Sequence, residues 1–77
     1  MAVKRRPIPD WLTLPWDART EQAVGSMRPR HVRVLRRYAE GRTDIEIAVE
    51  LGVHRSRAYQ IRIDAMDAVV SWLERQA

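Results

Sequence analysis

The chain has 77 residues, no cysteine, and an excess of Lys and Arg over Asp and Glu that gives a formal charge of +4 at pH 7. This length predicts one small domain with a thin core and excludes a two-lobed enzyme with an enclosed cleft. The lack of cysteine excludes a disulfide framework and a thiolate metal site. No apolar run approaches the roughly 20 residues that span a bilayer, and no apolar signal core stands at the amino terminus, so we expect a soluble intracellular protein.

The basic charge is concentrated in the middle of the chain. Residues 26–62 hold nine Lys/Arg and four Asp/Glu, a net of +5, whereas residues 1–25 have a net of +1 and residues 63–77 a net of −2. Neutralisation of nucleic-acid phosphates requires such a concentration of cations. Arginine-rich helices are also often no more than solvated faces, so charge alone leaves both interpretations open.

Residues 1–16 hold three of the four prolines and two of the three tryptophans, a composition that predicts an extended arm. The arm is expected to pack on the domain's own last helix rather than to bind a partner. The basic triplet Lys4-Arg5-Arg6 is either a contact to the DNA backbone or minor groove or a tail. The apolar residues expected to pack are Trp11, Leu12, Leu14 and Trp16.

Two helices are predicted next. Asp17 is suited to cap a short helix over residues 18–24, which Gly25-Ser26 ends. A second helix is expected to begin near Pro29 and to stop at Gly41. Its apolar stripe comprises Val32, Leu35, Tyr38 and Ala39, and this stripe leaves Arg30, Arg33, Arg36 and Arg37 mostly outside.

The stretch from Thr43 to residue 62 predicts two helices joined by a tight glycine turn. Thr43 and Glu46 have the spacing of a capping box, and Gly52 can take the positive φ that ends a helix. The last helix is expected over residues 55–74. At 1.5 Å per residue it would be roughly 30 Å long, so another element must bury its second half. Its apolar stripe comprises Ala58, Ile61, Ala65, Met66, Val69 and Trp72 or Leu73.

This pattern is typical of a helix-turn-helix and makes double-stranded DNA the expected partner. The last helix carries polar side chains long enough to reach base edges and phosphates in a major groove. Tyr59 could instead cover the edge of the core, and Arg55 and Gln60 could belong to a solvated surface. These candidate DNA-binding residues of the last helix are Arg55, Ser56, Arg57, Tyr59, Gln60 and Arg62.

From Pro29 to about Val70 the chain resembles region 4 of sigma-70-type bacterial sigma factors and related sigma-like phage regulators. The resemblance covers a little over half of the chain and runs without a gap from Thr43 to Met66. The matching residues are Pro29-Arg30, Val34-Leu35-Arg36, Tyr38, Gly41, Thr43, Glu46-Ile47-Ala48, and Arg55, Arg57, Gln60 and Ile61, followed by Ala65-Met66.

The resemblance implies an all-α fold: a small three- to four-helix bundle with a helix-turn-helix and an extended amino-terminal arm. It implies that Arg55, Ser56, Tyr59 and Gln60 face bases, while Arg42, Thr43 and Arg57 touch or approach phosphates. His54, Ser56 and Tyr59 differ from the residues usual in the family, so we expect the preferred DNA sequence to be the chain's own.

The implied function is that of a small transcription regulator, cytoplasmic in a bacterium or a phage-infected cell. Nothing in the chain corresponds to the polymerase-binding domains of a sigma factor, and no motif predicts catalysis, a metal or a cofactor. Three alternatives stay open. The chain could be an interaction module that grips RNA polymerase, as an antiterminator does, or a small terminase subunit. It could also dimerise through its last helix, as LuxR-type regulators do.

Overall fold

The computed structural model describes residues 8–76 and shows four α-helices. A short 3-10 turn, η1 (Asp10–Leu12), precedes them. The helices are α1 (Ala18–Gly25), α2 (Pro29–Ala39), α3 (Asp44–Leu51) and α4 (Arg55–Arg75). The part of the chain that is described contains no strand, so the prediction of a small all-α bundle is confirmed. Lys4-Arg5-Arg6 lies outside the described residues.

The helices begin and end at the signals that the sequence carries. The Asp17 carboxylate accepts from the Thr20 backbone N–H at 2.7 Å, which caps α1, and Pro29 occupies the first turn of α2. Gly52 ends α3 with a φ of 70°, a left-handed conformation that side chains with a Cβ rarely adopt.

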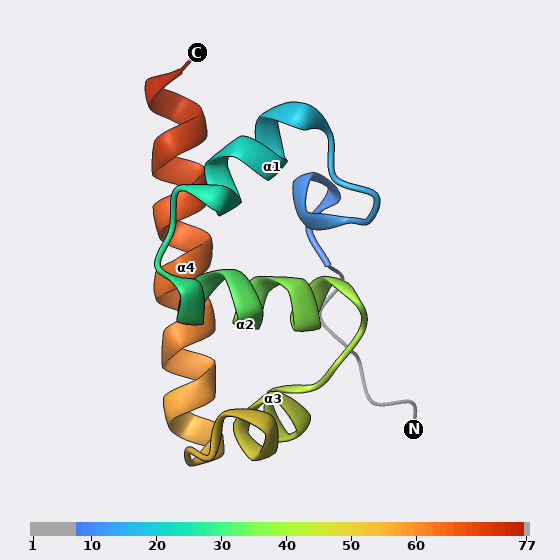
Figure 1. The fold of residues 1–77 in the computed structure, drawn as a ribbon, viewed down its shortest axis with the longest axis vertical. Coiled ribbons are helices and arrows are strands. Elements are labelled where there is room, and N and C mark those ends of the chain that lie inside the picture. Colours follow the sequence, from blue (N-terminus) through green and yellow to red (C-terminus); the bar gives the residue numbers. More distant parts are fainter. Residues whose placement is uncertain (1–7, 77) are drawn as a thin grey trace, which may run out of the picture.

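Helix α4 runs the whole length of the molecule, and the other helices stack along it (Figure 1). Helix α3 lies beside its amino-terminal end, α2 crosses its middle and α1 lies beside its carboxyl-terminal half. The Arg19 guanidinium on α1 donates to the Leu73 carbonyl on α4 at 2.9 Å. The second half of the long helix is therefore buried by α1 and by the segment before it.

Helix α2 separates two hydrophobic clusters. Val34 and Leu35, neighbours in sequence and both fully buried, point into different clusters. The upper cluster comprises Leu12, Ala23, Val24, Leu35, Ala65 and Val69. The lower cluster comprises Val34, Ile47, Ala48, Ala58 and Ile61. The single apolar stripe predicted for α2 omitted Val34, because a helix buried between two neighbours needs more than one apolar face.

The described part of the amino-terminal segment, residues 8–16, packs on the domain, as expected for the arm. Leu12 is fully buried, and Trp11 and Trp16 pack against the upper cluster. The Trp16 indole N–H donates to the Leu12 carbonyl at 2.8 Å, which satisfies its polar atom as it becomes buried. Leu14 was expected to pack with them, but it is 43% exposed. Residues 10–12 form a helical turn, so the expectation of a wholly extended arm is wrong there.

Among residues 8–76, no helix combines the length and the apolar composition needed to cross a membrane.

Candidate nucleic-acid interface

Helices α3 and α4 form a helix-turn-helix held by the lower cluster. The turn between them is closed by the Val53 backbone N–H, which donates to the Ala48 carbonyl at 3.0 Å, and the Val53 side chain packs against the cluster. Ala48 and Ala58 are both buried, and such small side chains let two helix backbones approach closely. The two helices are therefore held together near the turn, and no other element among residues 8–76 covers the exposed first turn of α4.

The start of α3 is fixed by the capping box that the sequence predicts. The Glu46 backbone N–H donates to the Thr43 hydroxyl at 3.2 Å, and the Thr43 backbone N–H donates to the Glu46 carboxylate at 3.1 Å. The hydrogen bond from the Thr43 backbone, assisted by that from its hydroxyl, lowers the pKa of Glu46 below its usual value. Thr43 and its neighbour Arg42 thus have defined positions at the amino end of the motif.

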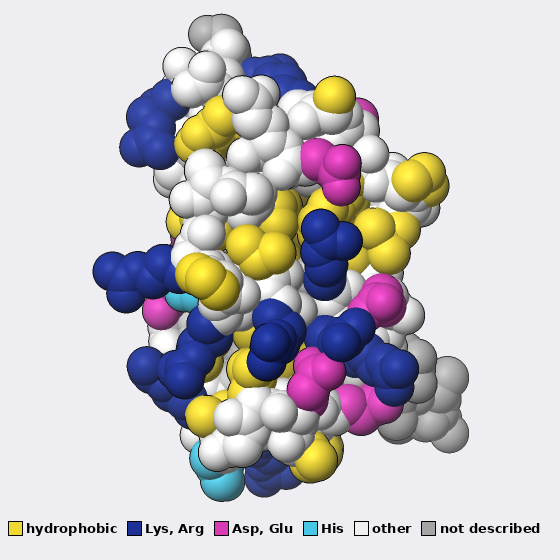
Figure 2. Space-filling view, in the orientation of Figure 1, with side chains coloured by type: hydrophobic (Ala, Val, Ile, Leu, Met, Phe, Trp, Pro, Cys, Tyr) yellow, Lys and Arg dark blue, Asp and Glu magenta, His cyan; other side chains and the backbone are white. Residues whose placement is uncertain are grey.

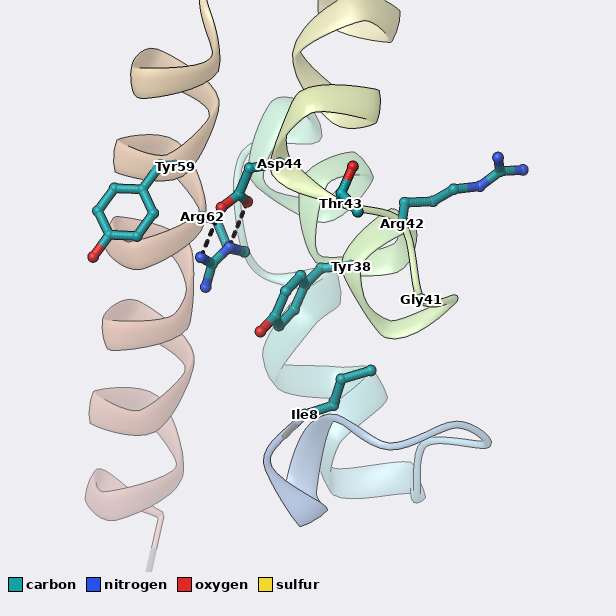
Figure 3. Close-up of a pocket in the computed structure, with 8 residues that line it drawn as sticks. All are labelled: Ile8, Tyr38, Gly41, Arg42, Thr43, Asp44, Tyr59 and Arg62. Atoms are coloured by element: carbon teal, nitrogen blue, oxygen red, sulfur yellow. Dashed lines mark hydrogen bonds and ion pairs between the residues drawn. The ribbon is translucent and has the colours of Figure 1, made fainter. Parts of the chain in front are cut away.

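Arg42 lies at the edge of the motif with its side chain directed outward (Figure 3). Its guanidinium approaches the Glu46 carboxylate at 3.4 Å, but both side chains are at least half exposed. An exposed pair of this kind contributes little to stability and is easily exchanged for another anion. Arg42 is therefore accessible to an external anion, and its contact with phosphate stays a prediction.

The first turn of α4 presents three exposed side chains, Arg55, Ser56 and Arg57. His54 caps this turn, since its Nδ1 accepts from the Ser56 backbone N–H at 3.2 Å and lies 2.8 Å from the Ser56 hydroxyl. The imidazole therefore caps α4, at a position where His54 differs from the residue usual in the family that the sequence resembles. Neither Arg55 nor Arg57 forms an ion pair with any residue between 8 and 76.

Tyr59 and Gln60 extend this surface by one helical turn. Residues three or four apart are neighbours on a helix, so Arg55 lies next to Tyr59 and Ser56 lies next to Gln60. Tyr59 is 42% exposed, and the Gln60 amide is exposed and donates to the Asp64 carboxylate at 2.9 Å. We call Arg55, Ser56, Tyr59 and Gln60 together the reading face. All four residues predicted to face bases are brought together on it, with Arg57 beside Gln60.

Arg62 does not belong to this surface. Only 5% of the residue is exposed, and its guanidinium donates to both carboxylate oxygens of Asp44, at 2.7 and 3.0 Å. Its guanidinium carbon lies 4.3 Å from the ring centre of Tyr38 and 5.2 Å from that of Tyr59 (Figure 3). This placement contradicts the expectation that Arg62 reaches DNA, because the α3 carboxylate occupies its donors.

The Arg62–Asp44 pair instead joins the two helices of the motif to α2. Hydrogen bonding to Asp44 raises the pKa of Arg62, so the guanidinium stays charged at every pH relevant to the folded protein. Sequence reasoning missed both Asp44 and Tyr38 as partners of Arg62. The available signal was that Arg62 directly follows Ile61, which places it at the edge of the buried stripe of α4.

Two hollows flank the pair. One has a volume of about 410 Å³ and lies between α2, the loop before α3, and α4 (Figure 3). A shallower groove of about 300 Å³ separates the first turns of α3 and α4. The residues that line this groove are Asp44, Ile45, Arg55, Ser56 and Tyr59.

Further basic side chains form a band over α2, interspersed with acidic ones (Figure 2). Arg37 is tied down within this band, because its guanidinium pairs with Glu50 on α3 at 2.9 Å and with Glu40 at 3.0 Å. Arg30, Arg33 and Arg36 are exposed. The positive charge near the motif therefore comes from side chains of which some are paired within the chain and others are accessible to an anion.

No group of three His, Asp or Glu side chains in the described part of the chain is arranged to hold a metal ion. A scan against protein-family models matches no family, and searches of curated proteins and of solved structures return no significant match.

Proposed function

We propose that this protein is a sequence-specific, double-stranded DNA-binding regulator of transcription that inserts the amino-terminal half of α4 into the major groove. The observation that supports this most is the reading face. Its four exposed side chains stand on the first two turns of a helix whose start is capped and whose base is fixed by the lower cluster. A rigid helix end with exposed donors and acceptors is what direct readout in a major groove requires.

The chemistry of the reading face suits base edges. An arginine such as Arg55 can donate two hydrogen bonds to guanine, and the amide of Gln60 can pair in two places with adenine. Arg42 and Arg57 flank the face and supply cations for phosphate oxygens, whereas the Thr43 hydroxyl already donates its proton to the Glu46 carboxylate. The resemblance to sigma region 4, with its phage-regulator relatives, agrees with this proposal and suggests action at a promoter.

The alternative in which the tryptophan segment grips RNA polymerase draws no support from the fold, because Trp11 and Trp16 pack against this chain's own upper cluster. Dimerisation through α4 by way of Val69 is likewise unsupported, since Val69 is fully buried within the monomer. Other surfaces of the molecule could still bind RNA polymerase or a second copy of the chain, or form part of a packaging ring.

The test is selection of a binding sequence from random DNA duplexes. We expect the unchanged protein to select a consensus and the double variant Arg55→Ala/Gln60→Ala to select none, with unchanged helicity. The matched control is Arg75→Ala/Gln76→Ala, which removes the same two side-chain types from the far end of α4. Selection that survives in the first double variant would overturn the proposal.

A salt titration separates phosphate contacts from base contacts. Removing one phosphate contact with Arg57→Ala should weaken binding to all sequences alike and reduce the slope of log affinity against log salt by about 0.9. The selected consensus should stay the same. A changed consensus with an unchanged slope would place Arg57 among the base-reading residues instead.

A further inference from the structure

Ile45 is exposed to an extent that the fold does not explain. It is 56% exposed at the second position of α3, whereas Ile47 and Ala48 on the same helix are buried in the lower cluster. An isolated exposed isoleucine needs no explanation in general. This one lines the shallow groove between α3 and α4, opposite the reading face.

The groove is lined by both apolar and polar residues. Ile45 and Tyr59 are the residues with large apolar surface that line it, and Arg55 and Ser56 line it as well. Asp44 also lines it, but its charge is neutralised by the two hydrogen bonds from Arg62. The groove therefore offers a small hydrophobic site directly beside a cationic hydrogen-bond donor.

We propose that the groove between Ile45 and Tyr59 receives the C5 methyl group of a thymine next to the base that Arg55 contacts. This inference rests on the proposed function and adds a specificity determinant on α3, outside the reading face. In the major groove, thymine differs from the other bases by its C5 methyl group, and apolar side chains are what recognise it. The cations at the first turn of α4 favour DNA over an apolar protein segment as the occupant.

Replacing thymine by deoxyuridine removes the methyl group and nothing else. In the consensus selected by the unchanged protein, we expect one thymine at which this replacement weakens binding about fourfold, which corresponds to the burial of one methyl group. In Ile45→Ala the same replacement should have no effect, because the apolar wall is gone. Direct competition at fixed salt measures both affinities.

Val49→Ala is the matched control. Val49 lies one turn further along the same helix and is 78% exposed, but it does not line the groove, so this variant should keep the fourfold response. Melting curves establish that both variants fold, which is expected because both side chains are exposed. A response equal in all three proteins, or absent from every thymine, overturns the inference while leaving DNA binding intact. Failure to select any consensus overturns the proposed function instead.

Discussion

The upper and lower halves of the molecule are stabilised by different means. The upper half, around Leu12 and Val69, is closed by aromatic and aliphatic side chains from the amino-terminal segment, α1 and the end of α4. The lower half has an aliphatic core on which no tryptophan among residues 8–76 packs, and it contains in addition the Arg62–Asp44 ion pair and a capping box. Only the lower half presents the reading face. Apolar packing therefore anchors the long helix at one end, while polar contacts set its geometry at the other.

The largest expected effect comes from a charge placed in the upper cluster. Val69 is fully buried, so Val69→Asp should destabilise the fold by more than about 4 kcal/mol and leave the chain largely unfolded. Circular dichroism with urea unfolding measures this loss. The adjacent Val70 is 36% exposed, and Val70→Asp should stay folded.

This pair of variants also separates burial from association. If α4 formed a dimer through its exposed side, Val70→Asp would lower the measured mass in sedimentation at high concentration while the helicity stayed. If Val69→Asp remained fully helical with a cooperative transition, the upper cluster would not be what holds the carboxyl-terminal half of α4 in place.

A middle-sized effect is expected from the ion pair, and it should be asymmetric. The Arg62 side chain is only 6% exposed, and Asp44→Ala leaves its guanidinium without a partner. This variant should lower the free energy of unfolding by about 2 kcal/mol. Arg62→Met keeps apolar contact with Tyr38 and leaves the Asp44 side chain, 28% exposed, to be hydrated, so it should cost about 1 kcal/mol. Urea midpoints of the two variants test the order.

Hydrogen exchange localises the same loss. Both variants should raise the exchange rate of α3 amides more than that of α1 amides, because the pair joins α3 to α4 and has no contact with α1. An equal loss of amide protection in all helices would mean that the two halves unfold only as one unit. The two halves would then differ in the side chains that they contain but not in local stability.

Local signals in the sequence were sufficient for the helices. Asp17, Pro29, the Thr43–Glu46 box and Gly52 each act within one turn of the chain, so their effects can be predicted without knowing the fold. The same holds for the reading face, because residues 55–60 lie on consecutive turns of a single helix whose start was marked.

What could not be predicted depends on pairs of residues far apart in sequence. Arg62 was grouped with the DNA-contacting residues because it is a long polar side chain on the last helix, and its partner Asp44 is 18 residues away. The groove of Ile45 likewise exists only once α3 and α4 are placed against each other. Val34 was left out of the predicted stripe because a sequence pattern does not show that α2 lies between two clusters.

The smallest expected effect concerns pH and the capping box of the lower half. The pKa of Glu46 is lowered in the folded state by the Thr43 backbone hydrogen bond, so its ionised form stabilises the fold. By linkage, this contribution is complete above the unfolded-state pKa and is lost as the pH falls through the lower folded-state value.

Glu46→Gln can still accept both hydrogen bonds but does not titrate. Urea midpoints measured from pH 7 to pH 2 should therefore fall less steeply for Glu46→Gln than for the unchanged protein. The control Glu74→Gln, an exposed position near the end of α4, should follow the unchanged protein. Parallel curves for Glu46→Gln and the unchanged protein would show that the box acts through its geometry alone and owes nothing to the charge of Glu46.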